Sequence, residues 1–87
     1  MRIVYDEVKR QTNLKKHRLD FADLEESFFR DAWLEPARNG RFKAVGAFEG
    51  RLVVAVIAKP LGTEAVSVIS MRPAKRQERK GNETQMA

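Results

Sequence analysis

The chain contains no cysteine, a single histidine and no long apolar run. Without thiols it forms neither disulfides nor thiolate metal sites, which fits a reducing compartment, so we expect a cytoplasmic protein. One histidine, His17, argues against a histidine-based structural zinc site, and we expect no metal and no cofactor. The longest apolar run, residues 52–58, is as long as a strand, whereas a membrane span needs roughly 20 apolar residues, so we expect no membrane partner.

Charge is distributed unevenly along the chain, whose formal net charge is +5 at pH 7. Residues 1–18, 36–71 and 72–87 each have more Lys and Arg than Asp and Glu, whereas residues 20–35 have six acidic groups and one basic group. A basic excess favours an anionic partner such as nucleic acid, without indicating whether that partner is only bound or also cleaved. The acidic segment is free to contact a basic segment of a partner protein.

Two helices are predicted in the first third of the chain. Asp6 can accept a hydrogen bond from a free N–H of a first turn, so it caps a basic, lightly buried helix. Apolar residues recur at spacings of three and four between residues 20 and 29, which predicts a second amphipathic helix with Asp20 as its cap. Residues 3–5 form either a brief edge strand or a hydrophobic anchor. Residues 33–36 are extended or form a turn, because residues before a proline avoid helical angles.

Three strands are predicted in the second half of the chain. Residues 41–48 alternate between two faces, and the turn residues Glu49 and Gly50 join them to the next strand as a hairpin. Residues 52–58 are apolar on both faces, which predicts the central strand of the sheet. Residues 59–63 form a loop, and residues 65–71 form the third strand.

The third strand is expected to run directly into a basic helix. Alternation places Val66, Val68 and Ser70 on one side of the strand and Ser67, Ile69 and Met71 on the other. Pro73, which has no N–H to donate, suits the first turn of the helix, and Gly81 is expected to end it. Four cations share one face of this helix at spacings of three and four: Arg72, Arg76, Arg79 and Lys80. The alternative is an ordinary solvated helix with a basic face.

Together these elements predict an α+β fold with two N-terminal helices, an antiparallel sheet of three to four strands with helices on one face, and a C-terminal helix. A chain of 87 residues is long enough for one compact core, and we expect residues 1–81 to form a single domain. Residues 82–87 have no core-forming pattern, and we expect them to be a disordered tail.

No strong enzymatic motif is present: the chain has no phosphate-binding glycine loop and no zinc-ligand spacing. Metal-free cleavage of RNA requires less than such a motif. One group takes the proton of the ribose 2′-hydroxyl, one protonates the leaving 5′-oxygen, and cations stabilise the added charge on phosphorus. Arginine suits the last task because its planar fork binds two phosphate oxygens and keeps its charge.

Five residues are candidates for such chemistry, each with a structural alternative. His17 can carry a proton near neutral pH, or it can cap a carbonyl at a helix end. Arg41 can reach a groove from the start of a strand, or it can be an exposed strand-edge residue. Ser70 can orient a phosphate or bond to backbone as a buried hydroxyl, and Glu78 can form a surface ion pair with a neighbouring cation. Trp33 can stack on a base or belong to the core.

An ordered set of short motifs extends over nearly the whole chain. Its residues are Tyr5, Asp6, Asn13, Lys16, His17, Phe21, Arg41, Phe42, Gly46, Ile69, Ser70, Arg72, Ala74, Glu78 and Arg79. This set resembles the BrnT family, in which an aromatic–Asp pair, an Asn-x-x-Lys-His motif, an Arg-Phe…Gly strand and a closing Ile-Ser-x-Arg-x-Ala…Glu-Arg motif occur in the same order.

The resemblance implies the toxin of a type II toxin–antitoxin system, with a RelE-like fold and a metal-independent ribonuclease activity that blocks translation. It also implies a BrnA-like antitoxin that neutralises the toxin, forms a hetero-oligomer with it, and contacts operator DNA through a ribbon-helix-helix part. Of the matched residues, we expect Arg41 and Arg72 to be phosphate and transition-state cations and His17 or Glu78 to carry the proton. The residues expected to bind RNA are Lys15, Lys16, Ser70, Lys75, Arg76 and Arg79.

The chain also departs from the family pattern. Ser67 stands where the family often has Arg, Gly40 where it often has Glu, and Arg18 where it often has Gly. The tyrosine that usually follows the Glu-Arg pair is absent. The alternative function is therefore a non-catalytic basic module, an inactive family member that binds nucleic acid or a protein without cleaving RNA.

Overall fold

The computed structural model describes residues 1–50 and 52–86, with the backbone alone for 83–86. Its elements in chain order are β1 (Arg2–Tyr5), α1 (Glu7–His17), the 3-10 turn η1 (Phe21–Asp23), α2 (Glu26–Asp31), β2 (Trp33–Pro36), the 3-10 turn η2 (Arg38–Gly40), β3 (Phe42–Phe48), β4 (Leu52–Leu61), β5 (Ala65–Pro73) and α3 (Arg76–Met86). The α+β class is confirmed. No described helix has both the length and the apolar character needed to cross a membrane.

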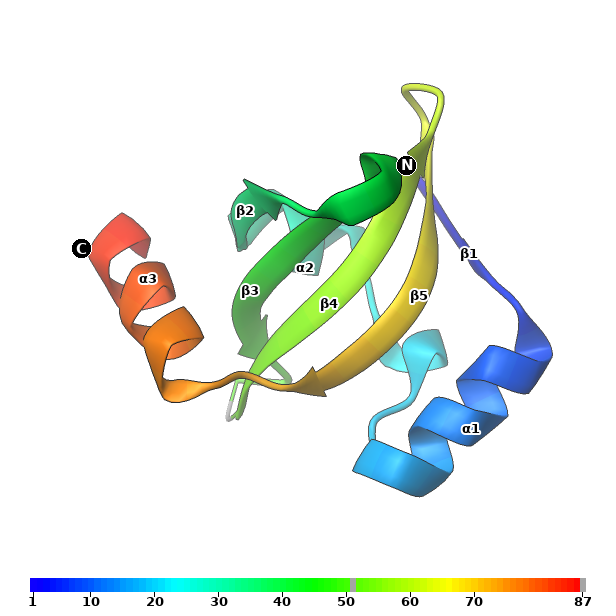
Figure 1. The fold of residues 1–87 in the computed structure, drawn as a ribbon, viewed down its shortest axis with the longest axis horizontal. Helices are drawn as coiled ribbons and strands as arrows, with labels where there is room; N and C mark the ends of the chain where they lie inside the picture. Colours follow the sequence, from blue (N-terminus) through cyan, green and yellow to red (C-terminus); the bar gives the residue numbers. More distant parts are fainter. Residues whose placement is uncertain (51, 87) are drawn as a thin grey trace.

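The strands form one sheet in the order β1-β5-β4-β3-β2 (Figure 1). Within the described residues it has five strands, where we expected three to four. It is mixed rather than antiparallel, because β1 pairs with β5 in parallel and places Arg2 opposite Ala65. Parallel neighbours need a long connection, and here the whole chain from α1 to β4 supplies it. The segments 2–5 and 33–36 are the two edge strands, and Pro36 ends one of them, where a missing N–H is tolerated.

The predicted second helix is interrupted. Asp20 does cap a turn, since its Oδ1 accepts from the N–H of Ala22 at 2.9 Å, but that turn is the short η1. Leu24 and Glu25 then take extended backbone angles before α2 begins. Because the helix is interrupted, the apolar side chains before and after the break can all be buried. Leu19, Phe21, Leu24, Phe28 and Phe29 are each less than 9% exposed. A continuous helix would direct these residues over more than one face.

The main core lies between the sheet and the segment 19–31, and Figure 1 shows α2 behind the strands. The central strand β4 contributes Val54, Val56 and Ala58, which are fully buried, as its two-sided apolar pattern predicted. Gly46 of β3 faces this layer, where a Cβ would come within 3.2 Å of the Ala32 Cβ. The close approach of α2 to β3 therefore depends on a residue without a side chain.

A bulge at Ile69 changes which β5 side chains face the core. Ile57 of β4 pairs with Ser70, but the next residue, Ala58, pairs with Val68, so Ile69 has no direct partner. The predicted alternation is therefore wrong beyond Val68. The core-facing residues are Val66, Val68 and Met71, whereas Ser67, Ser70 and Arg72 face the other side. One extra residue reverses the alternation because side chains on a strand repeat every two residues.

Both strands of the last hairpin are longer than predicted. Pro60, expected in a loop, belongs to β4, and Pro73, expected to open the helix, is the last residue of β5. Each lies where its strand has a neighbour on one side only, so a proline costs no ladder bond on the open side. Since Arg72 lies on β5 and α3 begins at Arg76, Arg72 does not share a helical face with the cations of α3.

Helix α3 continues past Gly81, where we expected it to end. The backbone of 82–86 is helical, although we expected a disordered tail there, and Ala87 lies outside the described residues. Gly81 packs directly on the ring of Trp33, and a Cβ at this position would overlap that ring. Trp33 therefore belongs to a second small core with Val45, Ala55 and Ala74, rather than being presented to a base.

We predict that Gly81→Ala destabilises the protein. In an exposed helix this change is favourable by about 0.5–1 kcal/mol, but here overlap with Trp33 should lower the free energy of unfolding by about 1–3 kcal/mol. Chemical denaturation measures the loss, and the fluorescence of the single tryptophan reports whether α3 separates from it. The control is Gln77→Ala at an exposed position of α3, expected within about 0.5 kcal/mol of wild type. Equal stability and fluorescence in Gly81→Ala would show that α3 does not pack on Trp33.

Candidate active site

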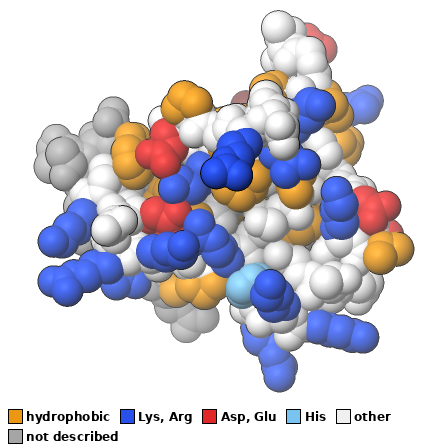
Figure 2. Space-filling model, viewed as in Figure 1, with side chains coloured by type: hydrophobic (Ala, Val, Ile, Leu, Met, Phe, Trp, Pro, Cys, Tyr) orange, Lys and Arg blue, Asp and Glu red, His pale blue; other side chains and the backbone are white. Residues whose placement is uncertain are grey.

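The face of the sheet opposite the main core is only partly covered. Two rows of directly opposed residues cross it: Trp33, Val45, Ala55 and Arg72 in one row, and Glu35, Lys43, Ile57 and Ser70 in the next. Helix α3 packs over the apolar end of the first row, where Gly81 meets Trp33. The expectation that the helices lie on one face of the sheet is therefore wrong, because α2 covers the other face. The polar residues of both rows lie beyond it on an open surface where Lys and Arg side chains gather (Figure 2).

Glu78 of α3 lies at the centre of this polar group. Its side chain is 8% exposed, and its two carboxylate oxygens accept hydrogen bonds from both terminal nitrogens of Arg72, at 2.7 and 2.9 Å. Lys43 donates to it at 2.8 Å, and so does the backbone N–H of Lys75. Lys43 also bonds Glu35 at 2.7 Å. The carboxylate therefore connects β3, β5 and the start of α3.

These contacts determine the charge state of the cluster. The hydrogen bonds from Arg72, and then those from Lys43 and the Lys75 N–H, hold the pKa of Glu78 far below its usual range. The bond to Glu78 raises the pKa of Arg72, and bonds to Glu35 and Glu78 raise that of Lys43. The alternative interpretation of Glu78, a surface ion pair with Lys75 or Arg79, is therefore wrong: its ion pairs are with Arg72 and Lys43, and its side chain is buried. A carboxylate with these bonds stays ionised at neutral pH and is a weak base, which suits it poorly to carry a proton.

A groove of about 400 Å³ lies between α1 and the last part of β5. Its lining residues are Val8, Lys9, Thr12, Asn13, Lys16, His17, Ile69, Ser70 and Arg72. The structure thus brings together four of the predicted site residues from the two ends of the chain: Lys16, His17, Ser70 and Arg72. Among the described residues, no group of three or more His, Asp or Glu side chains is arranged to hold a metal ion.

Helix α1 is positioned by polar contacts. Asp6 caps it as predicted, accepting from the N–H of Lys9 at 3.0 Å. The only buried residue of α1 is Asn13, whose amide donates to the carbonyl of Leu19 and accepts from the N–H of Met71, at 3.0 and 3.1 Å. Asn13 therefore fixes the distance between α1 and β5, and so the width of the groove. Arg10 adds two bonds to Asp20, which together with the Ala22 N–H lower the pKa of Asp20 to about 2.

The structural alternatives for His17 and Ser70 find no support in the described residues. Neither side chain forms a hydrogen bond to backbone there, and both are only half-buried at the groove. Arg41, expected to open the strand, lies one residue before β3. It does not line the groove and has no ion pair within the described part of the chain. Lys15 lines other hollows of α1.

The predicted RNA-binding residues of α3 and of the segment before it stand apart from the groove. Lys75 and Arg76 are exposed, and the Arg79 guanidinium donates to the carbonyl of Ala74 at 3.3 Å. Sequence reasoning missed Lys43 and the positioning role of Asn13. Asn13 belongs to the family motif, and its position as a polar residue in the middle of a helix could have indicated a buried hydrogen-bonding role. Nothing in the sequence indicated a role for Lys43, because the alternation of its strand predicts an ordinary exposed residue.

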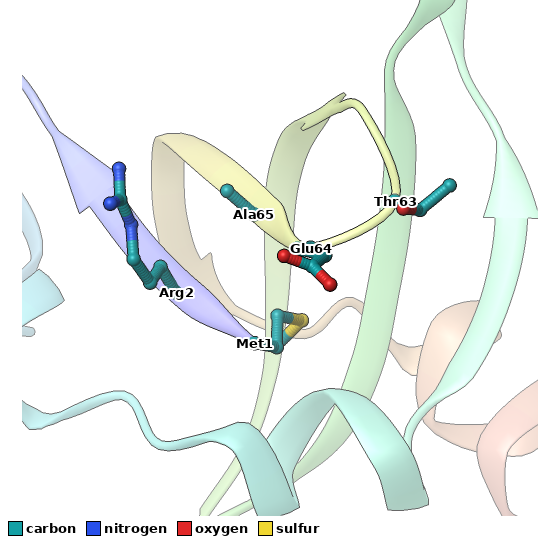
Figure 3. A pocket seen from close by; sticks show the side chains of 5 residues that line it. All are labelled: Met1, Arg2, Thr63, Glu64 and Ala65. Atoms are coloured by element: carbon teal, nitrogen blue, oxygen red, sulfur yellow. The ribbon is translucent and has the colours of Figure 1, made fainter.

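A second hollow, of about 510 Å³, lies at the other end of the sheet (Figure 3). It is lined by Met1, Arg2, Thr63, Glu64 and Ala65, where β1 begins beside the turn into β5. None of the predicted site residues lines it. The groove beside Arg72, although smaller, is therefore the better candidate for the site.

We predict that Glu78→Gln lowers stability in a pH-dependent way. Because folding lowers the pKa of Glu78, its ionised form stabilises the protein above pH 4.5, the ordinary value, and this contribution is lost as the pH falls. The free energy of unfolding of the variant should be about 1–3 kcal/mol lower than that of wild type at pH 7. This gap in stability between the two proteins should narrow below pH 4.5. Denaturation at several pH values measures it. Glu25→Gln, an exposed control, should match wild type throughout; a gap independent of pH would contradict the ionic role.

Comparisons with known proteins identify the family of the chain. Residues 5–78 match the family model described as the ribonuclease toxin BrnT of a type II toxin–antitoxin system. A search of curated proteins found no match. Among solved structures, the chain is similar to the Brucella abortus ribonuclease toxin BrnT, with 54% identity and a TM-score of 0.82 over 87% of this chain and 99% of that one. The chain belongs to the BrnT family of ribonuclease toxins of type II toxin–antitoxin systems.

Proposed function

We propose that this chain is a metal-independent endoribonuclease that cleaves RNA and thereby inhibits translation. The observation that supports this most directly is the groove that joins His17 and Lys16 of α1 to Ser70 and Arg72 of β5. An imidazole, a hydroxyl and a fixed cation surround this hollow. Attack of a 2′-oxygen on the neighbouring phosphorus can use the imidazole for one of its two proton transfers and the cation for the charge that develops on the phosphate.

Arg72 is the proposed cation for the reacting phosphate. Glu78 holds both of its terminal nitrogens, and Nη1 also donates to the carbonyl of Pro73 at 3.3 Å. Within the described residues this leaves Nε–H and one Nη2–H without a partner, and these lie on the same edge of the planar group. That edge can bind two phosphate oxygens at once, and the ion pair with Glu78 keeps it in place.

His17 is the proposed proton carrier, since the contacts of Glu78 leave that residue a positioning role. It would take the proton of the attacking 2′-hydroxyl or deliver one to the leaving 5′-oxygen, and water would exchange the other proton. Ser70 can orient the phosphate by a hydrogen bond, and Lys16 adds positive charge to the same groove. Arg41, outside the groove, is proposed to contact a further phosphate of the substrate. The remaining proposed RNA contacts are those of Lys15, Lys75, Arg76 and Arg79.

Membership of a toxin–antitoxin family implies an antitoxin partner and an RNA substrate. We propose that this antitoxin is BrnA-like, that it forms a hetero-oligomer with the toxin, and that operator DNA is contacted through its ribbon-helix-helix part alone. The open basic face is a suitable surface for it to cover. The cytoplasm is the proposed site of action, because RNA and ribosomes are there.

Arg72→Ala should abolish most cleavage by the purified protein in EDTA. Removing one transition-state cation is expected to cost about 10²–10³-fold in rate. Because the change also leaves Glu78 with fewer partners, Arg72→Lys, which keeps the charge but not the planar fork, accompanies it, and circular dichroism checks the fold. The matched control is Arg30→Ala, an exposed arginine of α2. Binding of RNA without cleavage by wild type, in EDTA or with Mg²⁺, would favour the non-catalytic module instead.

His17→Gln should separate proton transfer from binding. Loss of a general acid or base is expected to lower kcat by about 10²–10⁴-fold, while KM and the affinity for an uncleavable 2′-deoxy analogue change little. Single-turnover cleavage and anisotropy measure the two quantities. Reduced affinity with unchanged kcat would instead make His17 a substrate contact.

A further inference from the structure

The open sheet face carries further cations beyond the groove. Lys59 lies on β4 directly opposite Ser67 of β5. On the other side, β3 and β4 pair as far as Phe42 opposite Ala58. Arg41, the next residue outward, lies just beyond this paired register with extended backbone angles, so its place along the chain follows the direction of β3 towards the level of Lys59. Opposed residues of neighbouring strands point to the same side of a sheet. Lys59 and Ser67 therefore share one face, and alternation from Lys43 places Arg41 on that face too, at the end of the row just beyond β3.

This row lies on the same face as the proposed site. Residues two apart on a strand share a face, so Lys59 faces the same side as Ile57 and Ala55, whose partners across the strand are Ser70 and Arg72. The four residue steps from Ala55 to Lys59 span about 13 Å along the strand. Ile57, which is half-buried, lies between Lys59 at one end of this span and Arg72, opposite Ala55, at the other.

The two cations of the row lack anionic partners. Lys59 is exposed and Arg41 is half-buried, and neither forms an ion pair or side-chain hydrogen bond within the described part of the chain. Arg72 and Lys43, by contrast, are both bonded to Glu78. Two adjacent unpaired cations repel each other, and an anion between them would remove that repulsion. The hydroxyl of Ser67 lies next to them as an additional donor.

We propose that Arg41, Lys59 and Ser67 form a second phosphate-binding subsite, which holds single-stranded RNA at a phosphate other than the one bound by Arg72. The proposal rests on the ribonuclease function proposed above and adds to it a minimum length of substrate. A dinucleotide without terminal phosphates has one phosphate and cannot occupy both positions, whereas a longer strand crossing the sheet can. An acidic protein segment is the other class of partner for such a row, but continuity with the groove favours RNA.

The first measurement is binding, which does not depend on catalysis. The probe is a single-stranded 2′-deoxy oligonucleotide several nucleotides long, which has no 2′-hydroxyl to attack its phosphates, and anisotropy gives its Kd over a series of salt concentrations. Lys59→Ala should weaken binding and reduce the slope of log K against log salt by about 0.7, the value for one contact to a single strand. Lys59→Arg should retain the slope, and the control Arg30→Ala should match wild type. Lys59 is exposed, so the variants should fold.

The second measurement compares substrates of different length. Lys59→Ala should raise KM for the longer RNA about 5- to 10-fold, with kcat unchanged and cleavage of a dinucleotide unchanged. Equal slopes and equal KM for Lys59→Ala and wild type would overturn the subsite and leave the row to an acidic protein segment. A matching loss on the dinucleotide would also overturn it, since Lys59 would then act at the reacting phosphate. If wild type cleaves neither RNA, the ribonuclease function fails, and the binding slopes still decide on the subsite.

Discussion

The buried carboxylate of Glu78 is the interaction on which the candidate site depends. Arg72 and Lys43 come from strands on either side of β4 and would repel each other across Ala55 and Ile57. Burial of Glu78 between them is costly, but three side-chain hydrogen bonds and one backbone N–H compensate for the lost water. Because α3 supplies the carboxylate, the orientation of Arg72 depends on the packing of this helix against the sheet.

Helix α1, which lines the groove opposite β5, is held by a different kind of contact. Helix α1 buries only Asn13, and Val8 is 72% exposed, so apolar packing contributes little to its placement. Apolar contacts are non-directional, whereas the Asn13 amide bonds one carbonyl and one N–H in defined directions. Two polar connections, Asn13 for α1 and Glu78 for α3, thus place His17 and Arg72 around the same hollow on a sheet whose main core lies on its other face.

Local signals in the sequence predicted local structure well. The Asp6 cap, the turn at Glu49 and Gly50, where both residues have positive φ, and the central position of β4 were read from neighbouring residues and are confirmed. The interruption at Leu24, the parallel pairing of β1 and the bulge at Ile69 were not predicted, because each depends on what a segment packs against. The bulge matters most, since it turns Ser70 and Arg72 to the same face as Lys43.

The sequence by itself determined the family, the α+β class, the basic character of the chain and the identity of the groove residues that belong to the motif, because these depend on residue types and their order. Only the tertiary structure decided which of those residues lie together. Glu78 meets Lys43 across 35 positions, and Asn13 meets Met71 across 58. Contacts over such separations depend on strand register and helix placement, which no local pattern specifies. For that reason a residue that alternation marks as exposed, such as Lys43, lies beside the candidate active site.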